Sequence, residues 1–144
     1  MNHLEKVKEL ELPYDQFVLV GGSILDIHGI RKSDDMDVVV SSQAFQTLKG
    51  RGWPVDPVFK EKWGRERLVQ DVFEIYTDLY FQKIDYYLPF EVLKEMSKQM
   101  KGVYIQSLGA LLLIKFDIGR EKDMIDIKLI EEYLLGQRRA GMQN

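Results

Sequence analysis

Two aspartates one residue apart, Asp35 and Asp37, lead directly into an apolar run at residues 38–40. Alternate side chains of a β-strand point to the same face, so the two carboxylates should lie side by side. Neighbouring carboxylates repel each other unless a cation lies between them, and Mg²⁺ and Mn²⁺ prefer oxygen ligands. The spacing therefore predicts a divalent-metal site. The alternative is a solvated strand end that binds nothing.

A glycine-rich turn precedes this pair in the sequence. The apolar residues 17–20 stop at Gly21 and Gly22, and Ser23 stands where a helix should begin. As the helix cap, Ser23 would leave backbone N–H groups facing an anion such as phosphate. Such a turn is common by itself. Inside one strand–helix–strand unit with the aspartate pair, it indicates nucleotide chemistry.

Two charged residues stand in line with apolar helix faces in the last third of the chain. Lys115 shares its face with Leu108, Leu111 and Leu112, so its amine must either extend to water or meet an anion. Asp123 heads the apolar stripe of the next helix, where it either complements the helix dipole or serves a binding site. Both alternatives stay open from the residues alone.

Hydrophobic periodicity and turn residues predict the elements that position these groups. We expect helices over residues 3–12, 23 to about 28, 41 or 42 to about 50, 89–100, 107–119 and 120–136. We expect strands over residues 17–20, 35–40, about 63–69, 72–77 and 103–105. Residues 53–59, with two prolines, should form an irregular connection, and the aromatic stretch 80–87 a wall over the core. This mixed order predicts an α/β protein of the α+β kind, with helices packed on a mixed sheet.

Length and composition restrict the class of protein. The chain has 144 residues, 45% of them hydrophobic, which predicts a single domain with a frayed tail from about residue 137. The absence of cysteine excludes disulfides, thiolate zinc sites and a cysteine nucleophile, and the net charge of −3 argues against a general nucleic-acid binder. The sequence lacks a signal peptide's apolar core and a membrane-length apolar run, so we expect a cytoplasmic protein without a membrane partner.

Together these residues resemble the nucleotidyltransferase superfamily, in the minimal form of MNT-like proteins and AbiEii-type toxin enzymes. The superfamily pattern is an apolar strand, a Gly-Gly or Gly-Ser turn and, about ten residues later, an acidic pair; here these are Gly22-Ser23 and Asp35-x-Asp37. A later strand supplies a third carboxylate, more usually Asp, which Glu74 in VFEIYTD matches. The stretch LLLIKFDIGREKDMIDI resembles the lysine and Arg-x-Lys-Asp-x-x-Asp region of AbiEii-like members.

The resemblance implies the nucleotidyltransferase fold and a two-metal transfer of a nucleotide from a nucleoside triphosphate to a hydroxyl group. It implies Mg²⁺ or Mn²⁺ as cofactor, held by Asp35, Asp37 and Glu74. Lys115 would join these acids as a catalytic residue. The implied nucleotide-binding residues are Gly21, Gly22, Ser23, Ser33, Lys115 and Asp123. The acceptor, whether an RNA end, a protein or a small molecule, and the base of the nucleotide stay open.

Two other functions remain as alternatives. A protein of the same fold could bind a nucleotide or a partner protein without catalysis, for example as half of a toxin–antitoxin pair. Whether the chain forms a homo-oligomer or a complex with a partner protein stays open. A metal-dependent nuclease uses similar acids but does not need the glycine turn. For the third acid, Glu74 is favoured because it lies inside the predicted strand, whereas Asp71 suits a turn and Asp78 follows the strand's end.

Overall fold

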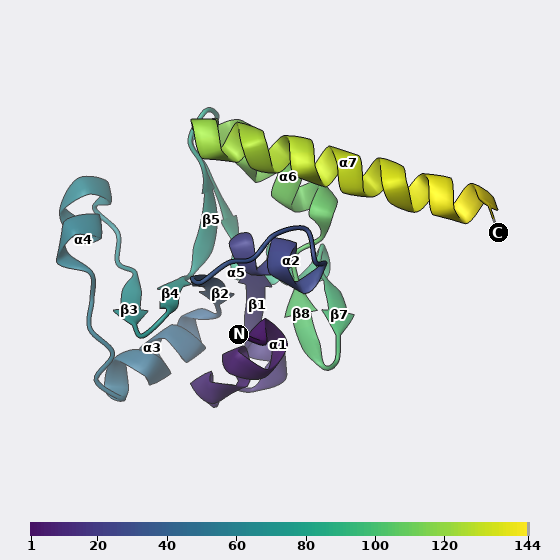
Figure 1. The fold of residues 1–144 in the computed structure, drawn as a ribbon. Helices are drawn as coiled ribbons and strands as arrows, with labels where there is room; N and C mark the ends of the chain where they lie inside the picture. The colour runs from purple at the N-terminus through teal and green to yellow at the C-terminus, as the bar shows by residue number, and fades with distance from the viewer. Residues whose placement is uncertain (144) are drawn as a thin grey trace.

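The computed structural model describes residues 1–143, and the side chains of residues 1–141 (Figure 1). Its α-helices are α1 (His3–Lys6), α2 (Gly22–Ile27), α3 (Ser42–Gly50), α4 (Pro57–Trp63), α5 (Phe90–Glu95), α6 (Leu108–Ile118) and α7 (Glu121–Gln143). Short 3₁₀ helices cover Val7–Leu10 and Tyr14–Gln16. The strands are β1 (Phe17–Val20), β2 (Met36–Val40), β3 (Leu68–Gln70), β4 (Phe73–Tyr76), β5 (Asp78–Phe81), β6 (Tyr86–Pro89), β7 (Lys98–Met100) and β8 (Val103–Ile105).

Six of these strands form one mixed sheet in the order β3-β4-β2-β1-β8-β7, which confirms the predicted mixed α/β architecture. Strand β1 runs antiparallel to β2 and parallel to β8. Strand β2 runs parallel to β4, and the two outer strands pair antiparallel with their neighbours. Strands β5 and β6 form a separate hairpin.

The two faces of the main sheet are covered differently. Leu19 and Val38 face the larger core, which α1, α2, α3 and α6 complete. On the other face, Val20 and Val39 pack under β6 and α5. Asp37 has the same parity as Val39, so it lies on this second face, at the end of the strand.

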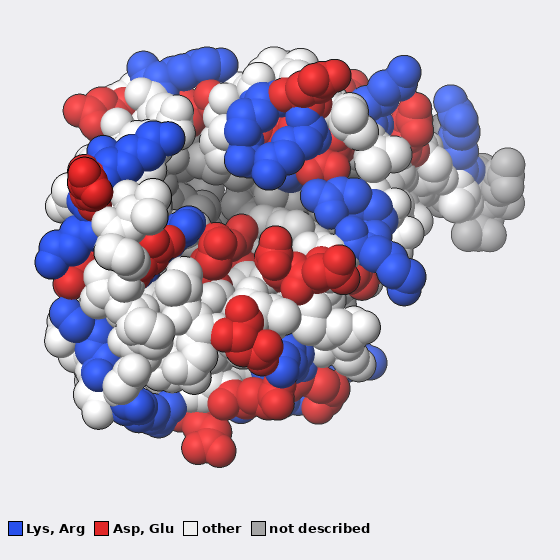
Figure 2. Space-filling model, turned by 60° about the vertical axis from the view of Figure 1, so that its left-hand side comes forward, with Lys and Arg blue, Asp and Glu red and all other residues white. Residues whose placement is uncertain are grey.

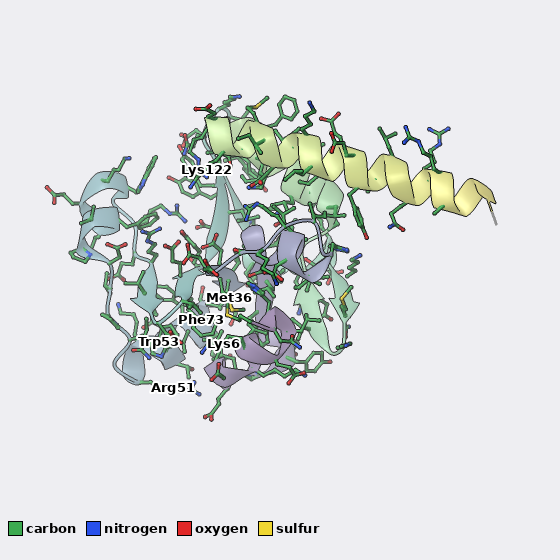
Figure 3. All side chains as sticks on the ribbon, in the orientation of Figure 1. Lys6, Met36, Arg51, Trp53, Phe73 and Lys122 are labelled. Atoms are coloured by element: carbon green, nitrogen blue, oxygen red, sulfur yellow. The ribbon has the colours of Figure 1, made fainter. Side chains whose placement is uncertain are left out.

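Figure 3 shows how the larger core is closed near the edge of the sheet. Met36 and Phe73 are neighbours in the β2–β4 register. The ring of Trp53 lies 5.9 Å from that of Phe73, and the amine of Lys6 lies 5.9 Å from the same ring. These contacts fix β4 against β2 from the face opposite the acidic residues.

Two connections differ from the sequence prediction. The segment expected to be irregular contains α4, because Asp56 accepts hydrogen bonds from the next backbone amides and Pro57 occupies the first helical turn. The strand expected over residues 63–69 is therefore reduced to β3, Leu68–Gln70. Its hairpin with β4 is confirmed, with Asp71 in the turn at φ 56°.

The second half of the chain also departs from the prediction. The helix expected over residues 89–100 ends at Glu95, and β7 follows because Lys101 and Gly102, both with positive φ, form a tight hairpin turn into β8. The aromatic stretch 80–87 belongs to the β5–β6 hairpin. Helix α7 continues through Gly136 to Gln143; the last residue of the expected frayed tail, Asn144, lies outside the described residues. Within residues 1–143, no helix is both long enough and apolar enough to span a membrane.

Candidate active site

Strand pairing brings the glycine turn and two of the acids to one end of the sheet. Asp37 on β2 pairs with Glu74 on the parallel strand β4, so their side chains lie next to each other on one face. Val20, the last residue of β1, also pairs with Asp37. The turn that begins at Gly21 therefore lies beside the same carboxylate.

A cleft of about 490 Å³ opens over this end of the sheet. Asp35, Asp37 and Glu74 line it from the sheet, and Lys115, Arg120, Lys122 and Asp123 line it from α6, α7 and the turn between them. Figure 2 shows the hollow with acidic side chains along one side and Lys and Arg side chains on the opposite side. Both charge types that a metal–triphosphate complex requires therefore face one cavity.

Burial and the neighbouring carboxylates raise the pKa of Asp37 to about 7. Burial is the largest cause, followed by the charge and hydrogen bonding of Glu74 and by the charge of Asp35, while Arg67 opposes the shift. Asp37 thus retains its proton up to near neutral pH. A cation placed between Asp37 and Glu74 would displace that proton.

Glu74 also has partners on the neighbouring strand. Arg67 lies with Nη1 3.3 Å from its carboxylate, and the Tyr76 hydroxyl donates to the same oxygen at 3.0 Å. Burial, and then the charges of Asp37 and Glu74, raise the pKa of Tyr76, so its hydroxyl stays protonated. Neither Arg67 nor Tyr76 was predicted as a site residue. The expected turn at residues 70 and 71 would place residue 67 opposite residue 74, whereas the observed register pairs Val69 with Glu74 and places residue 67 opposite residue 76.

The turn after β1 favours glycine, most strongly at Gly21. Gly21 has φ 70° and ψ −141°, and a Cβ there would lie 2.9 Å from Oδ2 of Asp37. A Cβ on Gly22 would lie 2.7 Å from Oγ of Ser33, in the loop that covers the turn. The Gly21 amide donates to Oε1 of buried Gln106, whose Nε2 has no partner among the described residues. An unpaired buried donor beside the turn suits an anionic ligand.

Replacing Gly21 with alanine is expected to destabilise the protein by about 3 kcal/mol, because backbone strain and the contact with Asp37 add together. The matched control is Gly29→Ala: Gly29 has the same φ of 70°, but an added Cβ meets nothing within 4 Å. That control should lose only about 1 kcal/mol. Urea denaturation measures both. Equal losses of stability in the two variants would show that an added Cβ at residue 21 does not clash with Asp37.

The hydroxyl of Ser23 is hydrogen-bonded to His3 and does not face the cleft. It is fully buried, and its Oγ lies 2.7 Å from Nδ1 of His3. Nε2 of His3 contacts two acceptors, the Ser33 carbonyl at 3.0 Å and Asp26 at 3.2 Å, so this nitrogen carries a proton. With the proton on Nε2, Nδ1 of His3 accepts the hydrogen bond from the Ser23 hydroxyl. The Ser23 hydroxyl is therefore not free to donate to a phosphate. The N-cap of α2 is Gly21 rather than Ser23, so only the backbone N–H groups of this turn remain for the anion.

The amine of Lys115 does not extend to water; it forms ion pairs with two aspartates. It is buried, with Nζ 2.8 Å from Asp126 and 3.4 Å from Asp123. Asp126 also accepts two hydrogen bonds from Arg31. Burial would raise the pKa of Asp126, but the hydrogen bonds from Arg31 and Lys115 lower it to about 2. The lysine is therefore held rigidly at the wall of the cleft.

Asp123 organises the start of α7. Its carboxylate accepts from the backbone amide of Arg120 at 3.1 Å and from Nε of the same residue at 2.6 Å. Burial disfavours the charge, but these bonds and Lys115 lower the pKa of Asp123 overall. These contacts agree with the interpretation of Asp123 as a residue that stabilises the N-terminus of α7. The same contacts also orient the side chains of Arg120 and Lys115. Figure 3 shows Lys122 at this same end of α7.

The opposite rim of the cleft is aromatic and cationic. The rings of Trp63 and Tyr80 meet edge to face at 6.1 Å. Arg65 lies 4.9 Å from the ring of Tyr87 and pairs with Asp78, whose pKa is raised by burial although Arg65 opposes the shift. Asp78 is therefore paired with Arg65 and is not a free carboxylate of the cleft.

No match to this chain was found among protein-family models, curated proteins or solved structures. Its function must therefore be inferred from the cleft itself.

The donor set of the cleft fits a hard divalent cation. In the described part of the chain, no three His, Asp or Glu side chains are already drawn together as a metal-binding group. Asp37 and Glu74 are nevertheless in contact, and Asp35 is exposed at the edge of the same cleft. All three offer carboxylate oxygens, the ligands of Mg²⁺ and Mn²⁺. Binding would require Glu74 to turn from Arg67 and Asp37 to lose its proton.

Proposed function

We propose that this protein has a nucleotidyltransferase fold and transfers a nucleotide from a nucleoside triphosphate to a hydroxyl group, with Mg²⁺ or Mn²⁺. The observation that carries the proposal is the pairing of Asp37 with both Glu74 and Val20. This pairing joins a carboxylate cluster to a glycine turn in one cleft. A nuclease would need the acids but not the turn, so the turn favours transfer.

Asp35, Asp37 and Glu74 would hold the metal, which when bound lowers the pKa of an acceptor hydroxyl and offsets the charge of a triphosphate. The raised pKa of Asp37 supports this assignment. Uncompensated carboxylates in one cleft destabilise the fold, and a bound cation removes that cost.

The opposite wall would bind the triphosphate. Lys115 and Arg120 present positive charge to the cleft, although both also pair with Asp123. The backbone amides at Gly22 and Ser23, together with Nε2 of Gln106, would donate to phosphate oxygens. These groups are fixed before the ligand arrives, which favours electrostatic stabilisation of the reacting state.

In the reaction, the acceptor oxygen forms a bond to the α-phosphorus while the bond from that phosphorus to the bridging oxygen breaks. Pyrophosphate leaves with the electron pair of that bond, and the proton of the acceptor hydroxyl passes to water. The chain's contribution is alignment of the two reactants and charge complementarity. Trp63, Tyr80 and Arg65 line the same cleft, and we assign them to the acceptor.

Incubation with each α-labelled nucleoside triphosphate, Mg²⁺ and fractionated cell lysate tests the proposal. We expect an RNA, protein or small-molecule product that carries the α-label, and no product labelled from the γ-position. Asp34→Asn is the matched control, because Asp34 is exposed and lies outside the cleft lining. Triphosphate binding without product would identify the non-catalytic alternative, and shortening of RNA without a triphosphate would identify a nuclease.

Lys115→Met is expected to weaken triphosphate binding about tenfold, the loss of roughly one charge-assisted hydrogen bond. The fold should persist, because Asp126 keeps Arg31 and Asp123 keeps Arg120 as partners. Calorimetric titration gives the affinity and thermal unfolding gives the stability. The control is Lys98→Met, which removes an exposed lysine on β7. Unchanged affinity with a raised melting temperature would show that Lys115 has only a structural role.

A further inference from the structure

Helix α7 carries a regular stripe on the side that faces away from the rest of the protein. Positions 121, 125, 128, 132, 135 and 139 follow steps of four and three residues, the spacing of a coiled-coil seam. All six residues are exposed, whereas Ile127 and Ile130 on the opposite side of the helix are buried. Figure 1 shows α7 lying across one end of the molecule with its outer side uncovered by other elements.

The composition of this stripe is unusual for a solvated surface. Ile125 and Leu135 are 58% and 49% exposed, although each is large and apolar. Charged residues occupy the other four positions, so that the stripe runs in order Glu121, Ile125, Lys128, Glu132, Leu135 and Arg139. When the stripe is aligned with itself in the reverse direction, each apolar residue lies opposite an apolar residue and each charged residue lies opposite a residue of the other charge.

We propose that this stripe is a docking surface for a second copy of the chain, with the two α7 helices antiparallel about a two-fold axis near residue 130. In this register Glu121 faces Arg139 of the second copy and Lys128 faces its Glu132. Ile125 faces Leu135 of the second copy. The axis repeats each contact, which gives four ion pairs and two apolar layers. The main bodies lie on opposite sides of the helix pair, because the stripe points away from the body.

The charges also exclude the parallel arrangement. In a parallel pair each residue meets its own copy, so four of the six layers would bring together like charges, which destabilise the association. The antiparallel overlap covers residues 121–139, about 27 Å of helix at 1.5 Å per residue. Two apolar layers with flanking ion pairs predict a dimer that dissociates on dilution.

Sedimentation of the full chain over a concentration series tests the association. We expect the wild type to approach twice the chain mass. Lys128→Glu should weaken the dimer about tenfold, because two attractive pairs become repulsive. The double change Lys128→Glu/Glu132→Lys should restore it, and the control Lys98→Glu on β7 should change nothing. A wild type that stays monomeric, which would leave the stripe to a different partner, or a double variant that fails to recover, would overturn the proposal.

Cross-linking tests the direction of the helices, and the absence of native cysteine gives a clean background. Glu131→Cys should cross-link to its own copy, because residue 131 lies one position from the proposed axis. Arg138→Cys, also at an exposed position, should not, since sixteen residues, about 24 Å, would separate the two thiols along the helix. Cross-linking at both positions or at neither would contradict the antiparallel pair.

Discussion

Asp37→Asn is expected to abolish nucleotide transfer and, above pH 7, to stabilise the fold. The loss of transfer should be on the order of 100- to 1,000-fold, the usual cost of removing one charge-stabilising group from an active site. The gain in stability arises because the ionised carboxylate is buried and is repelled by Glu74 and Asp35, whereas a neutral amide carries no charge. A variant that is more stable than the wild type and yet inactive would distinguish loss of an active-site group from loss of the fold.

The pH dependence of this gain follows from the raised pKa. In the unfolded chain Asp37 loses its proton near its ordinary pKa of 3.8, whereas in the folded protein it retains it up to about 7. The folded state therefore binds more protons over this range, and the free energy of unfolding falls as pH rises from 4 to 7. Three pKa units correspond to at most about 4 kcal/mol. Asp37→Asn should remove this fall.

Urea denaturation of the wild type and Asp37→Asn at pH 4.5, 6 and 8 measures the effect. The curves should differ little at the lowest pH and most at the highest. Asp34→Asn, at an exposed position just before β2, should follow the wild type throughout. A constant difference across the three pH values would show that Asp37 does not titrate in this range.

Glu74→Gln is expected to lose transfer by a similar factor, 100- to 1,000-fold, while triphosphate binding changes only slightly. The amide oxygen can still accept from Arg67 and Tyr76, so the hairpin should keep its stability. The neighbouring charge disappears, so the pKa of Asp37 should fall towards its ordinary value. Single-turnover assays measure transfer, and carboxyl NMR measures the pKa.

Asp71→Asn is the matched control for Glu74→Gln. Asp71 lies in the same hairpin, at φ 56°, a conformation that asparagine tolerates well. This variant loses a salt bridge to Lys6 but nothing in the cleft. Full transfer by Glu74→Gln, with Asp71→Asn equally active, would remove Glu74 from the site.

The sequence predicted the part of the site that local patterns encode. The run 17–20, the turn at Gly21 and the alternation at Asp37 each determine a short element, and those elements form as expected. The placement of Glu74 beside Asp37 also follows from parity, once its strand is paired with β2.

The rest of the site depends on contacts between distant segments. Ser23 is bound to His3, twenty residues earlier, which no local pattern reveals. Gln106 reaches Gly21 because β8 pairs with β1 across 85 residues. Helix α4 was missed for a different reason: the two prolines suggested an irregular connection, although Asp56 followed by Pro57 is a helix start.

Calorimetric titration with nucleoside triphosphates whose α–β bridge cannot be cleaved tests the central claim most directly. The account predicts that wild-type protein binds such an analogue only with Mg²⁺ or Mn²⁺, that the matching monophosphate binds much more weakly, and that Asp37→Asn loses the metal dependence. Metal-independent binding, or equal affinities for monophosphate and triphosphate, would contradict it.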